Sequence, residues 1–175
     1  MISAGVSELE VLVSGMVERG AALDAAHMTK IAGAVSRVFS VQPDEVAILW
    51  VTQDNRFLRF RVPEQLQSVG QIPLTSNASL AVRTVRDKRP EVVNHFNIVP
   101  HASVFEAVRL RDERSDPIQK IISAPITAGA KVVGVLQVSR KAKTAKGARD
   151  FTPQDLRQLI SISELLAPAL SLCED

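Results

Sequence analysis

The stretch that decides the fold is Ile118–Ser139, IQKIISAPITAGAKVVGVLQVS. It holds two runs rich in Ile and Val, Ile118–Ile126 and Lys131–Ser139, separated by Thr127-Ala128-Gly129-Ala130. Runs rich in β-branched residues favour strands, and a glycine in a short connection supplies the positive φ that a tight turn needs. The stretch therefore predicts a β-hairpin.

A second hairpin is predicted upstream. Glu45–Val51 is apolar on both faces, the pattern of a central strand, whereas Phe57–Val62 alternates and places Leu58, Phe60 and Val62 on one face. A turn at Asp54-Asn55 joins them. Residues 91–94 add a short strand, and residues 95–116 show no clear period and are predicted to form a long functional connection.

Helices are predicted where a capping residue precedes apolar residues at helical spacing. The segments are residues 7–20, 24–42, 77–88 and 152–170, with caps at Ser7, Asp24, Ser76 or Asn77, and Thr152. Strand pairs joined by tight turns, with helices before, between and after them, predict an α/β (α+β) fold built on a mostly antiparallel sheet.

Composition excludes several classes of protein. Hydrophobic residues make up 46% and charged residues 23%, as in ordinary globular domains. A net charge of +2 and an aromatic content of 4% argue against nucleic-acid binding, and no apolar run approaches the roughly 20 residues of a membrane span. Cys173 is the single cysteine, which excludes an internal disulfide, and the N-terminus does not resemble a signal peptide. A cytoplasmic location is expected.

Three stretches resemble the GAF domain family, and the resemblance extends from about Asp24 to the C-terminus. They are Ser79–Val85 running into Arg89–Val93, Ser123–Ile126 through Lys131–Val138, and Phe151–Leu156. The resemblance implies a six-stranded antiparallel sheet with the terminal helices on one face and a ligand pocket on the other. It divides the chain into an N-terminal amphipathic helix (residues 1–20), for dimerisation or signalling, and the GAF domain (residues 21–175).

The resemblance also implies which residues line the pocket. They are Ala47 and Phe60 on the first hairpin, Ser79, Leu80 and Ala81 on the short helix, His101 and Phe105 in the long connection, and Gln137 on the last strand. The apolar members could equally be ordinary core. Gln137 is more informative, because an amide in an apolar strand costs free energy unless it is hydrogen-bonded. Ser76 and Asn77 join the candidates, because a helix N-terminus is a natural anion site, although they could merely cap the helix.

The expected function is regulatory. No standard catalytic motif is present, and the two loop histidines His95 and His101 are too few for a dedicated metal site, so neither an enzyme nor a metal is predicted and no cofactor is named. The resemblance implies a sensor in signal transduction that binds a small, polar or anionic ligand, forms a homodimer through its N- and C-terminal helices and acts on a downstream partner. The alternative is a ligand-free dimerisation or protein-interaction module.

Two activities of related domains are disfavoured. Cyclic-nucleotide-binding members carry Asn-Lys, Phe and Asp-Glu where this chain has Arg140-Lys141, Phe151 and Asp155-Leu156, so the Asn and the Glu are missing, although Lys141 could still pair with Asp155. Members that reduce free methionine sulfoxide or attach bilins use cysteines at the pocket. Cys173 follows the last predicted helix and is not expected to reach it.

Overall fold

The computed structural model describes residues 4–20, 24–96 and 116–171. The elements, in chain order, are helices α1 (Ala4–Glu18) and α2 (Ala25–Phe39), strands β1 (Val46–Val51), β2 (Phe57–Val62) and β3 (Gln71–Pro73), helix α3 (Leu80–Asp87), strands β4 (Glu91–Val93), β5 (Ile118–Ala128) and β6 (Lys131–Lys141), and helix α5 (Pro153–Leu170). The short 3-10 helices are η1 (Pro43–Glu45), η2 (Glu64–Val69) and η4 (Ala145–Gly147).

The six strands form one antiparallel sheet in the order β3-β2-β1-β6-β5-β4. β1 is buried along its whole length between β2 and β6, as its apolar sequence predicts. β5 and β6 form the predicted hairpin, and Gly129 in its turn has φ +63°. The predicted α+β fold with a largely antiparallel sheet is therefore confirmed. The sequence did not predict a strand at β3.

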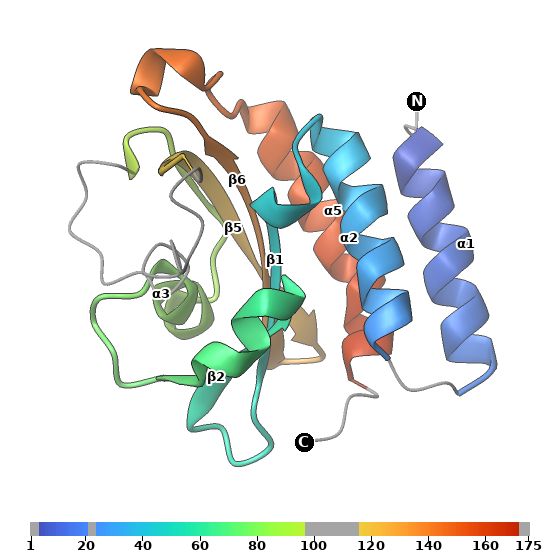
Figure 1. Cartoon of the computed structure of the whole chain (residues 1–175). Helices are drawn as coiled ribbons and strands as arrows, with labels where there is room; N and C mark the ends of the chain where they lie inside the picture. The colour runs from blue at the N-terminus through green and yellow to red at the C-terminus, as the bar shows by residue number, and fades with distance from the viewer. Residues whose placement is uncertain (1–3, 21–23, 97–115, 172–175) are drawn as a thin grey trace.

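The helices form three layers around the sheet (Figure 1). α2 and α5 cover one face, α3 covers the other, and α1 packs on α2 and α5 rather than on the sheet. Leu9, Val13 and Met16 of α1 are buried in the core that α2, α5 and the sheet share. The apolar stripe of α1 is therefore covered within the chain.

Two details differ from the sequence-based expectation. α1 begins at Ala4, so Ser7 lies inside the helix and does not cap it. Val62 does not share a face with Leu58 and Phe60, because the pairing of β1 with β2 shifts register between Ile48 and Leu49. Val62 packs in the core beneath α2, whereas Leu58 and Phe60 pack beneath α3.

Candidate functional site

The face of the sheet beneath α3 holds most of the predicted pocket residues. Ala47 of β1, Phe60 of β2 and Ala81 of α3 are buried in one apolar cluster. Leu80 lies in a second cluster, with Val93 and other residues near the start of β5. The structure thus brings these four residues to the same face, where they serve as packing residues.

A chain of buried polar groups crosses this face. The Gln137 Nε2 of β6 donates to the Ser123 Oγ of β5 at 3.2 Å, and that hydroxyl lies 2.7 Å from the Thr84 Oγ1 of α3. Thr84 Oγ1 in turn donates to the Leu80 carbonyl oxygen at 2.9 Å. Since each hydroxyl has a single proton, the donors run in one direction, from Gln137 through Ser123 and Thr84 to Leu80.

This polar chain ties two strands to α3 in a buried setting. Gln137 is 4% exposed, Thr84 1% and Ser123 0%. Gln137 was predicted from its sequence to need a partner, and Ser123 provides one. Ser123 and Thr84 were not among the residues that the sequence predicted to line the pocket.

The start of α3 differs from the prediction. Ser79 is the N-cap, and its side chain accepts a hydrogen bond from the Val82 N–H at 3.3 Å. Ser76 and Asn77 precede the cap and do not cap the helix: the Ser76 Oγ accepts from the Ala78 N–H, and the Asn77 Oδ1 accepts from the Arg86 Nη1. Ser79 has an extended backbone (φ −106°, ψ 126°), and its hydroxyl takes the capping position.

Arg83, a basic residue of α3, is already paired. The guanidinium of Arg83 donates two hydrogen bonds to the Glu91 carboxylate, at 3.1 and 2.8 Å. This bidentate pair joins α3 to β4. His101 and Phe105, the two remaining candidates, lie outside the described residues.

At the positions of the cyclic-nucleotide motif, Arg140 and Phe151 contact each other, and we call the contacts of Arg140 with Phe151 and nearby carbonyl oxygens the clasp. Arg140 of β6 lies 3.9 Å over the Phe151 ring and donates to the carbonyl oxygens of Arg149, Asp150 and Phe39. Burial, and then the charge of Arg149, lower the pKa of the Arg140 guanidinium. The clasp fastens the end of β6 to the segment before α5 and to the end of α2.

Lys141 and Asp155, which could have paired in a cyclic-nucleotide motif, each have other partners. The Lys141 Nζ pairs with Asp44 of η1 at 3.2 Å. The Asp155 carboxylate accepts from the Thr152 N–H at 2.8 Å, within the predicted capping box at the start of α5. These side chains therefore hold helix ends and strand ends in place.

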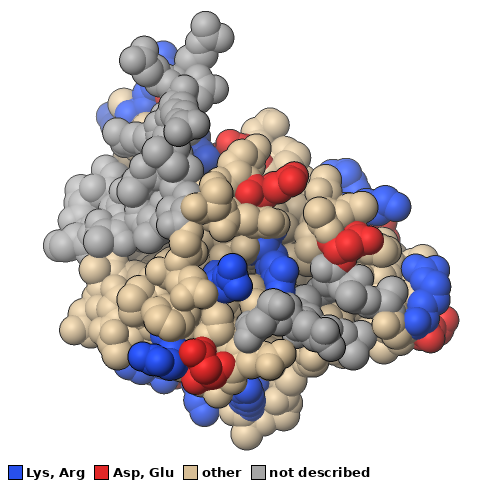
Figure 2. Space-filling model, turned by 60° about the horizontal axis from the view of Figure 1, so that its bottom comes forward, with Lys and Arg blue, Asp and Glu red and all other residues tan. Residues whose placement is uncertain are grey.

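On the face drawn in Figure 2, basic and acidic side chains are interspersed, so this face has no large patch of one charge. Within the described ranges, no helix has the length and apolar character needed to cross a membrane. The same residues contain no group of three or more His, Cys, Asp or Glu side chains placed to hold a metal ion.

A model of the GAF domain matches residues 25–171, the whole sheet together with α2, α3 and α5. The chain belongs to the GAF domain family. GAF domains are generally sensory or regulatory. No curated protein sequence matches the chain at a significant level.

Solved GAF domains share the fold at low sequence identity. The GAF domain of an Acinetobacter phosphoenolpyruvate-protein phosphotransferase is 14% identical with a TM-score of 0.68, covering 98% of this chain and 95% of that one. The GAF-B domain of DevS from Mycobacterium smegmatis is 19% identical with a TM-score of 0.56, covering 85% and 94%.

Enzymes occur among the similar structures as well. The type II free methionine-R-sulfoxide reductase from Thermoplasma acidophilum is 15% identical with a TM-score of 0.57, covering 83% of this chain and 94% of that one. The GAF fold therefore does not by itself decide between regulation and catalysis.

Proposed function

We propose that this GAF domain is a non-catalytic regulatory module of the cytoplasm that binds a small, polar or anionic molecule between α3 and the sheet and forms a homodimer through its terminal helices. The observation that carries the ligand part is the polar chain of Gln137, Ser123 and Thr84 inside an otherwise apolar face. Polar groups in such a setting cost free energy unless they are hydrogen-bonded, and ligand pockets combine apolar walls with a few fixed polar groups of this kind.

The groups of this polar chain have capacity to spare for a ligand. A glutamine amide has two N–H donors and a carbonyl oxygen that accepts, and the Gln137–Ser123 hydrogen bond uses one donor. The first N–H groups of α3, beside Ser79, add donors for a negative charge. A molecule with both hydrogen-bonding groups and a carboxylate or phosphate would suit this combination.

The cysteine content supports a non-catalytic role. The family's reductases use cysteines at the pocket, whereas Cys173 is the single cysteine in this sequence and follows the last helix, α5, along the chain. We expect no reduction of free methionine sulfoxide by the purified protein with a dithiol reductant. Turnover that disappears in Cys173→Ser would overturn this part of the proposal.

Dimerisation rests on the outward surface of α1. Its inner stripe is used within the chain, but Val11 is 76% exposed and Val17 39%. Val11 and Leu12 border a groove between α1 and α2, whose far wall includes Gly33 of α2. A large apolar side chain beside an open groove is a surface that a second copy could cover.

Light scattering tests this interface. Val11→Lys should convert a dimer into a folded monomer, because an ammonium group would be buried at the contact. Ser14→Lys adds the same charge at an exposed position of α1 that does not line the groove, and it should leave the dimer intact. A dimer that survives Val11→Lys removes α1 from the interface.

A thermal-shift screen of nucleotides, amino acids and small carboxylates tests the ligand part. A ligand at 100 times its Kd stabilises by about 2.7 kcal/mol, which corresponds to a rise in Tm of roughly 5 to 11 °C for a domain of this size. The rise should shrink in Ser123→Ala and persist in Ser163→Ala, a buried serine on α5 beneath the other face. Equal rises in both variants would contradict a site beneath α3.

A ligand-free dimerisation module is the second candidate. It is favoured by the packing of Ala47, Phe60 and Ala81 in one cluster and by the mutual hydrogen bonding of the polar chain. Under this alternative, no compound raises the Tm, but light scattering still reports a dimer.

A further inference from the structure

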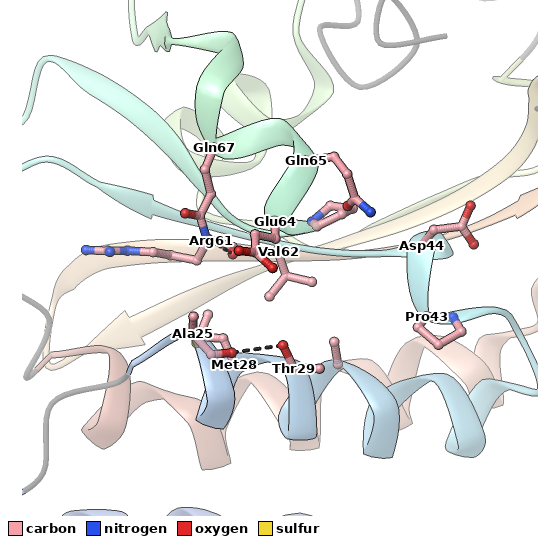
Figure 3. Close-up of a pocket in the computed structure, with 12 residues that line it drawn as sticks. Ala25, Met28, Thr29, Pro43, Asp44, Arg61, Val62, Glu64, Gln65 and Gln67 are labelled. Carbon is pink, nitrogen blue, oxygen red and sulfur yellow. Dashed lines mark hydrogen bonds between the residues drawn. The ribbon is translucent and has the colours of Figure 1, made fainter. Parts of the chain in front are cut away.

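A cleft lies on the opposite side of the sheet from the polar chain, between α2 and the segment formed by β2 and η2 (Figure 3). Its volume is about 240 Å³. Its floor consists of Met28 and Ala32 of α2 and Val62 of β2, all of which are buried. This site is separate from the proposed site beneath α3, because Val62 packs in the core on the α2 side.

The local sequence explains why the cleft is open. The register shift in β2 turns Val62 toward α2, and the chain then leaves the sheet at Pro63 to form η2, which overhangs the helix. On α2, the residues that face η2 include Ala25, Thr29 and Ala32, whose side chains are too short to fill the space. Pro43 closes one end (Figure 3).

The lip of the cleft carries polar groups, most of which already have partners. The Thr29 Oγ1 donates to the Ala25 carbonyl oxygen at 2.8 Å, and the Gln67 Nε2 donates to the Arg61 carbonyl oxygen at 2.8 Å. Asp44 is paired with a lysine of β6.

Two further charged groups at the lip differ in where they point. The Arg61 guanidinium lies 4.6 Å from the Trp50 ring centroid, and its side chain extends away from Glu64, Gln65 and Asp44 (Figure 3). Glu64 is exposed, and within the described part of the chain its carboxylate makes no ion pair. The negative charge at the lip therefore exceeds the positive charge that reaches into the cleft.

We propose that this cleft binds a small organic cation, with its apolar body on Met28, Ala32 and Val62 and its ammonium group at Glu64. The size agrees, since 240 Å³ corresponds to about eight water molecules at roughly 30 Å³ each and is below the roughly 300 to 1,000 Å³ of pockets for drug-sized ligands. A compact amine with one ring or a short branched chain fits this space. A carboxylate would meet the charge of Glu64 and would be repelled. An occupant would bridge α2 to η2, and this inference does not depend on the site beneath α3.

The test uses benzylamine, benzyl alcohol and benzoate as probes, which share a ring and differ in charge. Titrations are followed in ¹⁵N-labelled protein by amide chemical shifts. We expect benzylamine to shift amides of residues 25–32 and 61–67, with benzyl alcohol weaker and benzoate inactive. Shifts confined to α3 and the facing strands, or an equal response to all three probes, would overturn the proposal.

Substitution then tests the role of Glu64. Glu64→Gln should raise the Kd for benzylamine by about 1.4- to fivefold, the range that an exposed ion pair contributes. Glu18→Gln removes the same charge from an exposed position at the end of α1, away from the cleft, and should leave the Kd unchanged. An unchanged Kd in Glu64→Gln, or an equal change in both variants, would contradict the assigned ammonium position.

Discussion

Replacing Ser123 by alanine probes the buried polar chain at its centre. The hydroxyl of Ser123 links Gln137 of β6 to Thr84 of α3, at 3.2 and 2.7 Å. Ser123→Ala breaks both contacts and leaves an N–H of the Gln137 amide buried without its acceptor. Thr84 keeps its hydrogen bond to the Leu80 carbonyl oxygen, so it is affected less.

The expected loss follows from the contacts that are broken. A hydrogen bond contributes about 0.5 to 1.5 kcal/mol net, and a buried donor left without a partner costs about 1 to 3 kcal/mol. Because Ser123 and Gln137 are almost fully buried, water cannot easily replace the lost hydroxyl. We expect the free energy of unfolding to fall by about 2 to 3 kcal/mol and the Tm by roughly 4 to 12 °C.

Urea denaturation followed by circular dichroism measures this loss. Ser163→Ala is the matched control, because the Ser163 hydroxyl is equally buried but donates only to the Leu159 carbonyl oxygen of its own helix. It should change stability by no more than about 0.5 kcal/mol. A loss in Ser123→Ala no larger than in the control would refute the reasoning.

A double-mutant cycle separates the hydrogen bond from the loss of packing. Gln137→Met keeps the length of the side chain and removes the amide. If the unsatisfied amide is the main cost, Ser123→Ala should be less harmful in the Gln137→Met background, by about 1 kcal/mol or more. Additive losses would mean that the two side chains are not coupled.

Arg140→Lys should lower the free energy of unfolding by at least about 2 kcal/mol, because one ammonium group cannot replace a stacked guanidinium that donates to three carbonyl oxygens. Arg149→Lys should leave it nearly unchanged in the same urea titration. The Asp24 side chain caps α2, and the hydrogen bond from the His27 backbone N–H is the main cause that lowers the pKa of its carboxyl from 3.8. The ionised cap therefore stabilises the folded protein fully above pH 3.8, and this stabilisation is lost as the pH falls through the lower pKa of the folded state. The stability difference between wild type and Asp24→Ala should therefore shrink below pH 3.8. Gly134→Ala should cost about 1 to 3 kcal/mol, since the added methyl would collide with a β1 carbonyl and an α5 leucine, whereas Gly15→Ala has room and should stabilise α1 by up to about 1 kcal/mol.

The sequence predicts those elements whose local signals agree with their tertiary setting. In three places the local sequence favours the structure that the fold requires. These are the apolar run of β1, the glycine turn between β5 and β6, and the capping box at Thr152 that starts α5. The cap of α2 at Asp24 is confirmed for the same reason: a short acidic side chain precedes an apolar stripe. These features required no knowledge of which other elements lie nearby.

The sequence-based predictions fail where a contact between residues far apart in the chain determines the local structure. β3 is three residues long and exists because it pairs with β2, which no local pattern reveals. Val62 changes face at a register shift in its pairing with β1, and the alternating sequence of β2 does not show this shift. At α3, three polar residues could each cap the helix, and the folded chain uses Ser79.

The candidate site was predictable in part. Ala47, Phe60 and Gln137 lie on the face of the sheet beneath α3, and Leu80 and Ala81 are buried residues of α3 itself. The partners of Gln137 depend on the register of β5 with β6 and on the rotation of α3. Neither quantity follows from spacing along the chain, and thus Ser123 and Thr84 became evident only in the fold.

Native mass spectrometry of freshly purified protein tests the proposed regulatory function most directly, because one spectrum reports both the oligomeric state and any retained small molecule. We expect a dimer that carries additional small-molecule mass and releases it on mild collisional activation, with less retained by Ser123→Ala than by Ser163→Ala. A dimer of bare chain mass, still without added mass after incubation with compounds from the screen, would contradict the ligand part. A bare monomer under the same conditions would contradict the account as a whole.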